Sequence, residues 1–222
     1  MFKVKLNLRK MVAIAICLAG FSVSNVLAQD NTKDQGVVIN GVKWATRNVD
    51  KPGTFSDKPE APGMFYQWNR RVGWSATDPL VNSDRDTEWK GGDIDWNEID
   101  NEERRWEKSN DPSPTGWRIP TFSEMLTLLD KDKVINEWTT VNGVNGRKFT
   151  DKITGNSIFL PVVGERYQRN GSLCCVRQRS VYWSNYSSSK GRANGIGIRD
   201  EYALMILGDS YFSGFNVRPI AE

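Results

Sequence analysis

The acidic segment 93–97 has the pattern Asp-x-Asp-x-Asn, with which a calcium-binding loop begins. Calcium takes about six to eight oxygen ligands, and an EF-hand loop has glycine at its sixth position and glutamate at its twelfth. Glu98 and Arg104 occupy those two positions, so the EF-hand pattern fails. A solvated acidic loop is the simpler interpretation, and we expect no metal or other cofactor. The alternative is a looser calcium site formed by Asp93, Asp95 and Asp100.

The adjacent Cys174 and Cys175 form the second group that could do chemistry, since thiolates bind metals and form disulfides. Ordinary disulfide geometry needs Cα atoms further apart than one peptide link allows, so two neighbours bridge only as a strained vicinal ring. We expect two free thiols, one buried and one partly exposed. A vicinal or an intermolecular disulfide is the alternative.

The absence of histidine removes the usual general base and the commonest zinc ligand. The whole chain carries 30 basic and 27 acidic side chains. Residues 1–28 hold four of the basic residues and no acidic one, which leaves 26 against 27 and a net charge of −1. Nucleic-acid binding needs a clustered basic surface, so we expect no nucleic-acid partner. We also expect no enzymatic activity.

Residues 1–28 have the three parts of a Sec-type signal peptide. A basic region up to Lys10 precedes an apolar stretch, Met11–Phe21, that is too short to span a bilayer. Val26-Leu27-Ala28 is a small-residue cleavage site. We expect cleavage after Ala28, no transmembrane segment in the remainder, and export to the periplasm, the outer surface or the medium. An uncleaved N-terminal anchor is the alternative.

The 194 residues after this leader fit a single domain over 37–222, preceded by a flexible segment over 29–36. Asn40-Gly41, the preferred type I′ pair, lies between two apolar runs and predicts a hairpin. Nine tryptophans beside a low general hydrophobicity predict a core of a few large rings. The acidic, tryptophan-rich segment 70–115 follows neither a helix nor a strand period, so we expect a long insertion pinned by its tryptophans.

Thr121 stands three residues before Glu124, the capping-box spacing that opens a helix. We expect this helix from Phe122 to about Lys131, with an apolar face formed by Met125, Leu126, Leu128 and Leu129. Asn142-Gly143 and Asn145-Gly146 predict turns. The other expected strands cover 147–150, 157–163, 181–184, 195–199 and 202–207, with a hairpin over 164–171.

Three segments stand out by their order and spacing: Gly116–Thr121, Val181–Ser184 and Gly214–Ile220. The first ends at a proline before the capped helix, and the other two are aromatic and β-branched runs bounded by Gly, Ser and Pro. Together they resemble the Fibrobacter succinogenes major paralogous domain family, which is common in secreted Bacteroidetes proteins. The resemblance covers about residues 37–220, and the segment 70–115 matches poorly.

This resemblance implies an α+β, C-type-lectin-like fold, related to that of formylglycine-generating enzymes. Such a fold has small antiparallel sheets, one or two short helices, long loops, and N- and C-terminal strands close together. The resemblance implies that four residues belong to the structural framework: Trp44, Trp117, Trp183 and Arg218. We expect the tryptophans to be buried and the arginine to pair with a carboxylate or with backbone carbonyls.

The functional motifs of those relatives are missing. Formylglycine-generating enzymes hold copper with two cysteines several residues apart, whereas Cys174 and Cys175 are adjacent. The Glu-Pro-Asn, Gln-Pro-Asp and Trp-Asn-Asp motifs of calcium-dependent sugar-binding lectins do not occur. Both activities are therefore disfavoured, although sugar stacking on exposed aromatic rings is not.

The resemblance places the ligand face on two polar loops, 185–194 and 208–213. Their Tyr, Asn and Arg residues are typical of adaptable binding loops, although an ordinary polar surface is the alternative. We expect an exported, non-enzymatic module that binds a protein or a carbohydrate at the cell surface. A structural component of a surface appendage or envelope assembly is the second hypothesis. The candidate ligand-binding residues are Asn185, Tyr186, Lys190, Arg192, Asn194, Tyr211 and Phe212.

Overall fold

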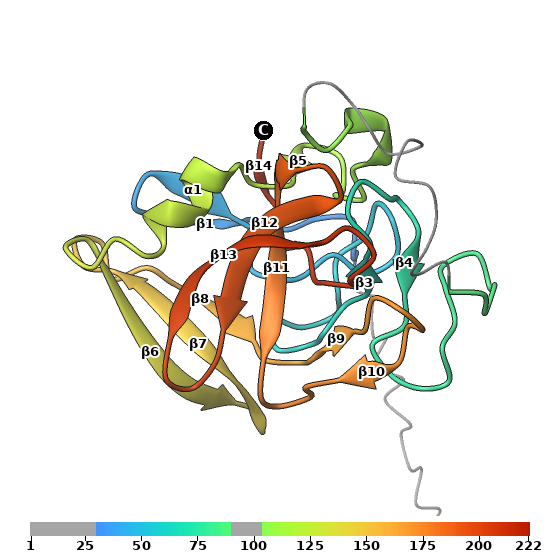
Figure 1. The fold of residues 1–222 in the computed structure, drawn as a ribbon. Helices are drawn as coiled ribbons and strands as arrows, with labels where there is room; N and C mark the ends of the chain where they lie inside the picture. The colour runs from blue at the N-terminus through green and yellow to red at the C-terminus, as the bar shows by residue number, and fades with distance from the viewer. Residues whose placement is uncertain (1–29, 90–103) are drawn as a thin grey trace, which may run out of the picture.

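The computed structural model describes residues 30–89 and 104–222. The expected signal peptide and the calcium candidates Asp93, Asp95 and Asp100 lie outside the described residues. The described chain consists mostly of small antiparallel sheets and loops, with a single α-helix, so the class is a mostly-β α+β fold (Figure 1).

Five sheets make up the structure, and the first joins the two ends of the domain. Its order is β1-β2-β14-β5, with bounds Val37–Ile39, Val42–Trp44, Ile220–Ala221 and Trp117–Arg118. The sheet β6-β7-β8 covers Val134–Val141, Val144–Asp151 and Ser157–Pro161. The sheet β11-β12-β13 covers Ser180–Ser189, Arg192–Ile198 and Ala203–Ser210. The two-stranded sheets are β3-β4, Phe65–Tyr66 with Gly73–Trp74, and β9-β10, Glu165–Arg166 with Leu173–Cys174. The helices are α1, Phe122–Thr127, and the 3₁₀ turn η2, Lys108–Asn110.

The sheet β11-β12-β13 lies between two hydrophobic cores, as its central place in Figure 1 suggests. Successive side chains of a strand point to opposite faces. On β11, Val181 and Trp183 therefore join an aromatic-rich core, while Tyr182 joins a mainly aliphatic one. The expectation of a core built from large rings holds for the first core and is wrong for the second.

Two hairpins follow their turn signals. Asn40 and Gly41 connect β1 to β2 with φ values of 46° and 81°, and Asn142 and Gly143 connect β6 to β7 with 48° and 81°. Asparagine and glycine are the residues that tolerate this left-handed backbone. The pairing of Ile220 with Trp44 also confirms that the first and last strands lie together.

Two local expectations are wrong. The helix α1 ends at Thr127 instead of about Lys131. The Asp130 carbonyl accepts hydrogen bonds from the amides of Lys133 and Val134, and this turn leads the chain into β6. Leu126 is 42% exposed, so it does not belong to the apolar face. Asn145-Gly146 lies inside β7 and forms no turn, because Gly146 packs where a Cβ would meet the Leu160 carbonyl at 2.4 Å.

The expected polar loop over 185–194 is also wrong, because β11 and β12 cover almost all of it. The only break is the turn at Lys190-Gly191. Both strands hold polar side chains that form hydrogen bonds within the hairpin, such as Ser184 Oγ to the Asn194 carbonyl at 2.9 Å, or to neighbouring segments, such as the amide of Gly208 to the Asn194 side-chain oxygen at 3.0 Å. The strand β11, which lies between the two cores, is therefore as rich in polar residues as a surface loop.

The described part of the segment 70–115 is tied to the domain by aromatic contacts. Trp74 and Trp89 lie 4.9 Å apart, and the indole nitrogen of Trp89 donates to the Gln168 carbonyl at 3.1 Å. Trp106 is 7% exposed and packs edge-on against Trp68 at 5.7 Å. These contacts agree with an insertion held by its tryptophans.

Residues 30–36, expected as a flexible lead-in, contact the domain through Asp34. The carboxylate of Asp34 is 1% exposed, forms an ion pair with Arg47 at 3.1 Å and accepts from the hydroxyl of Thr46 at 2.7 Å. Along 30–89 and 104–222, the longest helix is far shorter and more polar than a membrane crossing requires.

Candidate functional site

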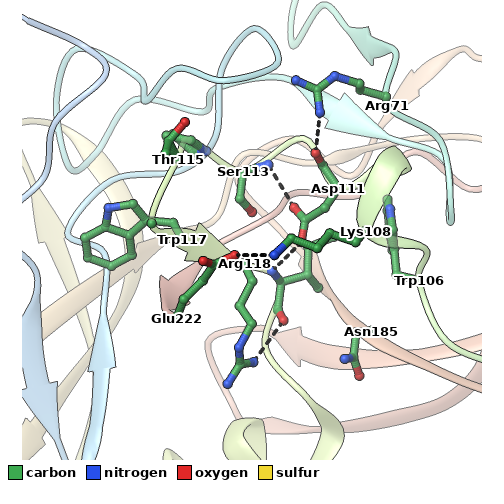
Figure 2. A pocket seen from close by; sticks show the side chains of 13 residues that line it. Arg71, Trp106, Lys108, Asp111, Ser113, Thr115, Trp117, Arg118, Asn185 and Glu222 are labelled. Atoms are coloured by element: carbon green, nitrogen blue, oxygen red, sulfur yellow. Dashed lines mark hydrogen bonds and ion pairs between the residues drawn. The ribbon is translucent and has the colours of Figure 1, made fainter.

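A pocket of about 590 Å³ opens beside the first of the three sequence motifs. This volume lies within the range of small-molecule sites. The lining combines two indole rings with charged and neutral polar groups (Figure 2). It comprises Arg71, Trp106, Lys108, Asp111, Ser113, Pro114, Thr115, Gly116, Trp117, Arg118, Ile119, Asn185 and Glu222.

The backbone of the pocket is held by Asp111 and by the last strand. The Asp111 carboxylate accepts from the amides of Ser113 at 2.8 Å and Ile119 at 3.0 Å, which fixes the loop on both sides of Gly116. The strand β14 pairs with β5, and the amide of Glu222 donates to the Gly116 carbonyl at 3.0 Å. Residues from the middle and from the C-terminal end of the described chain therefore build one wall.

The two indoles stand on opposite sides of the pocket in Figure 2. Trp117 packs edge-on against Phe55 with ring centroids 5.6 Å apart, and it is half-buried instead of buried as expected. Trp106 comes from the 70–115 segment, and its amide donates to the Asn185 carbonyl at 2.8 Å. The pocket thus joins the insertion to β11.

The charged side chains of the pocket are engaged with one another or with backbone. Arg118 donates to both Glu124 carboxylate oxygens, at 2.9 and 2.6 Å, and this contact lowers the pKa of Glu124 to about 2. Lys108 and Glu222 approach to 3.4 Å, and Figure 2 shows them meeting in the middle of the site. Arg71 donates to the backbone carbonyl of Asp111 at 2.7 Å.

Three neutral polar groups of the lining have no such commitment. Between residues 30 and 89 and from 104 onward, no hydrogen bond involves the side-chain amide of Asn185 or the hydroxyl of Thr115. The Ser113 hydroxyl oxygen is buried and has no hydrogen-bond partner there either. Thr115 is exposed and Asn185 is partly buried, so a ligand can pair with these two side chains without breaking a described contact.

The structure separates the candidate binding residues predicted from the sequence. Asn185 lines the pocket, whereas Tyr186, its neighbour on β11, is 40% exposed outside it. Lys190 and Arg192 are exposed around the β11–β12 turn.

The remaining three candidates are buried, so their expected place on an exposed binding loop is wrong. Tyr211 stacks on Trp68 at 4.4 Å, Phe212 is 4% exposed, and Asn194 accepts the amide of Gly208 at 3.0 Å. Large rings next to a closing strand are core material here because β13 ends at Ser210 and the chain then turns inward.

The framework residues are placed as follows. Trp44 and Trp183 are at most 1% exposed, and the indole nitrogen of Trp183 donates to the Tyr66 carbonyl at 2.7 Å. Arg218 is fully buried; it donates to the Ala45 carbonyl at 3.2 Å and to the Asn48 side-chain oxygen at 2.8 Å. The expected backbone carbonyl is present, and an amide takes the place of a carboxylate.

The sequence did not indicate that the first motif would line a pocket, with Asn185 and Glu222 beside it from just beyond the other two motifs. Gly116–Thr121 meets the second motif where the amide of Asn185 donates to the Pro120 carbonyl at 2.8 Å. It meets the third where Ile220 pairs with Arg118. Trp106 and Lys108 were missed because nothing in their neighbourhood distinguishes them from the rest of a polar insertion.

The donor atoms that could hold a metal ion lie elsewhere. In the described part of the chain, the group whose donor atoms converge is Glu165, Cys174 and Cys175, none of which lines the pocket. Burial raises the pKa of the Cys174 thiol to about 12, which makes it a poor nucleophile. No protein-family model, no curated protein and no solved structure matches this chain.

Proposed function

We propose that this protein is an exported, non-enzymatic binding module that takes a neutral carbohydrate into the pocket between Trp106 and Trp117. The proposal includes membership of the Fibrobacter succinogenes major paralogous domain family and its C-type-lectin-like fold. Export follows from the signal peptide that the sequence predicts over residues 1–28.

This proposal rests on which polar side chains of the pocket are already paired within the protein and which are not. The cations Arg118 and Lys108 already contact carboxylates, so a strongly charged ligand would have to displace an ion pair. The accessible side chains of Asn185 and Thr115, which have no described hydrogen bond, are available instead. A sugar ring presents an apolar face to an indole and hydroxyl groups to such side chains.

The meeting of the three motifs supports the family assignment. Segments that are distant in the chain but ordered like the family's motifs are expected to share one framework, and they contact one another through β5, β11 and β14. The calcium ligands of true C-type lectins are missing from the sequence, so the proposed binding is independent of calcium.

The test is a glycan array probed with the wild-type protein and two pocket variants. Trp117→Ala removes the exposed indole face and is expected to weaken binding at least about tenfold, and Asn185→Ala several-fold. Tyr186→Ala is the matched control, because Tyr186 follows Asn185 on β11 and lies outside the pocket. Binding should be unchanged in this control and in the presence of a chelator.

Two results would overturn the assignment. Loss of binding in Tyr186→Ala with retention in Trp117→Ala would move the ligand to the surface of the β11–β12 hairpin. Capture of a protein from cell-surface extracts, weakened by Trp117→Ala while no glycan binds, would keep the pocket and replace the ligand class.

A structural role in a surface assembly is the second candidate, favoured by the exposed edge strand β13. Leu207 on this strand is 69% exposed and Leu204 is 39% exposed. Unpaired edges with apolar side chains are sites of strand pairing between chains. Under this alternative, Leu207→Lys abolishes crosslinking into envelope assemblies and leaves glycan binding intact.

A further inference from the structure

The turn β9–β10 brings two thiols and one carboxylate together, apart from the pocket. Glu165 on β9 is the direct cross-strand partner of Cys174 on β10. Cys175 follows with a left-handed φ of 58°, and its sulfur lies 3.5 Å from that of Cys174. The Cys174 sulfur lies 3.9 Å from Oε1 of Glu165, and all three donor atoms are within 4.8 Å of one another.

These separations match the edges of a tetrahedral zinc site. With Zn–S of about 2.3 Å and Zn–O of about 2.1 Å, a tetrahedron has sulfur–sulfur edges of about 3.8 Å and sulfur–oxygen edges of about 3.6 Å. The observed 3.5 and 3.9 Å differ from these values by about 0.3 Å. The third edge, from the Cys175 sulfur to the Glu165 carboxylate, is at most 4.8 Å, so binding requires side-chain movements of about 1 Å or less.

The carboxylate is oriented by a second layer of charges. Oε1 of Glu165 faces the thiols, while Oε2 lies 3.5 Å from the Arg179 guanidinium. Arg179 is in turn 3.4 Å from the carboxylate of Asp209. Hydrogen-bonded or ion-paired second partners of this kind fix the ligands of metal sites. Two thiolates and a carboxylate around a dication leave one negative charge, which Arg179 offsets.

We propose that Glu165, Cys174 and Cys175 bind a thiophilic divalent cation of the zinc class, with a fourth position left for water or another donor. Each thiol loses its proton to solvent as its sulfur binds the metal, and no electron is transferred. The ion would join β9 to β10 and to the tight turn in which the Cys175 carbonyl accepts the amides of Gln178 and Arg179. This site does not depend on the proposed carbohydrate function.

The test is titration of the reduced protein with Co²⁺, followed by displacement with Zn²⁺. A Cys17→Ser background leaves Cys174 and Cys175 as the only thiols. The expected result is a sulfur-to-cobalt charge-transfer band with one equivalent bound, which zinc abolishes. Cys174→Ser and Cys175→Ser should each weaken zinc binding about a hundredfold or more, and Glu165→Gln about tenfold.

Asp209→Asn is the matched control, because it removes a carboxylate beside the same arginine without removing a ligand. Its zinc affinity should fall by less than that of Glu165→Gln, because Asp209 contacts Arg179 and not the ion. Thermal unfolding of each metal-free variant shows that it has folded. The proposal is overturned by equal affinity in Cys175→Ser, by Asp209→Asn matching Glu165→Gln, or by a thiol pair that oxidises to a disulfide instead of binding zinc.

Discussion

Arg218 is a fully buried cation that no described carboxylate contacts by hydrogen bond or ion pair. It links the end of the chain to the start of the domain through Asn48 and Ala45, while its second terminal nitrogen, Nη2, has no described partner. Burial lowers the pKa of Arg218 to about 10, because the surroundings disfavour the charged form. The side chain therefore contributes through shape and two hydrogen bonds more than through its charge.

Replacement of Arg218 should distinguish these contributions. Arg218→Ala leaves a cavity and unpaired acceptors, and we expect the free energy of unfolding to fall by about 3–5 kcal/mol. Arg218→Met fills most of the space without a buried charge, so its loss should be about 1–3 kcal/mol. Urea denaturation measures both. Equal losses in the two variants would show that the filled volume contributes little beside the hydrogen bonds and the charge, which both variants remove.

The helix α1 is only six residues long, and its first turn carries most of its specific contacts. Thr121 and Glu124 form a complete capping box, and the Glu124 carboxylate also accepts two hydrogen bonds from the Arg118 guanidinium. Arg118 lies on β5 and lines the pocket. The start of the helix therefore holds a pocket residue in place, which links a local signal in the sequence to the site.

The pH dependence of this element follows from Glu124. Its pKa is lowered to about 2 by the Arg118 contact, below the unfolded value of about 4.3. The resulting stability is present above about pH 5 and is lost as the pH falls toward 2. Glu124→Gln should lower the free energy of unfolding by about 1–2 kcal/mol at pH 7.

Urea denaturation of wild type and Glu124→Gln between pH 7 and pH 2 measures this effect. The difference between the two proteins should shrink steadily below pH 5, because protonated Glu124 resembles glutamine. A difference that is constant over this range would contradict the pKa assigned to the contact.

Elements with strong local signals were predictable, and those defined by tertiary burial were not. Asn40-Gly41 and the Thr121 cap fix their own backbone within four residues, so the hairpin and the helix start were expected correctly. The hairpin β11–β12 is largely buried, and its serines are paired within the hairpin or with Gly164 and Tyr211, yet its polar composition is typical of a loop. The pocket required Trp106 to meet Asn185, and no local pattern encodes that contact.

At the scale of the whole molecule, β14 joins two strands that do not pair with each other directly. The strand β14 lies between β2 and β5, and Ile220 belongs to the aliphatic core. Glu222 lies two residues after Ile220, and its amide donates a hydrogen bond to the Gly116 carbonyl in the pocket wall. The aliphatic core and the wall of the proposed binding pocket therefore share one short segment.

Shortening the chain should reveal this coupling. A stop after Pro219 removes β14, and we expect a loss of about 3 kcal/mol or more with loss of glycan binding. A stop after Ala221 is the control, since it removes only Glu222 and leaves Ile220 in the core. That control should remain folded, with weaker binding. Thermal unfolding and the glycan array measure the two effects, and an unchanged melting temperature after the first truncation would contradict the role assigned to β14.

The central position of β14 also dictates the order of events when the protein is made. Of the described strands, β14 leaves the ribosome last, yet β2 and β5 meet each other only through it. Contacts between distant parts of a chain form slowly because closing a long loop costs entropy. The sheet therefore cannot close before β14 has been synthesised, and until then the chain lacks the strand that joins β2 to β5. Under the proposed export through a Sec-type channel, which threads chains unfolded, this arrangement would keep the sheet open during translocation.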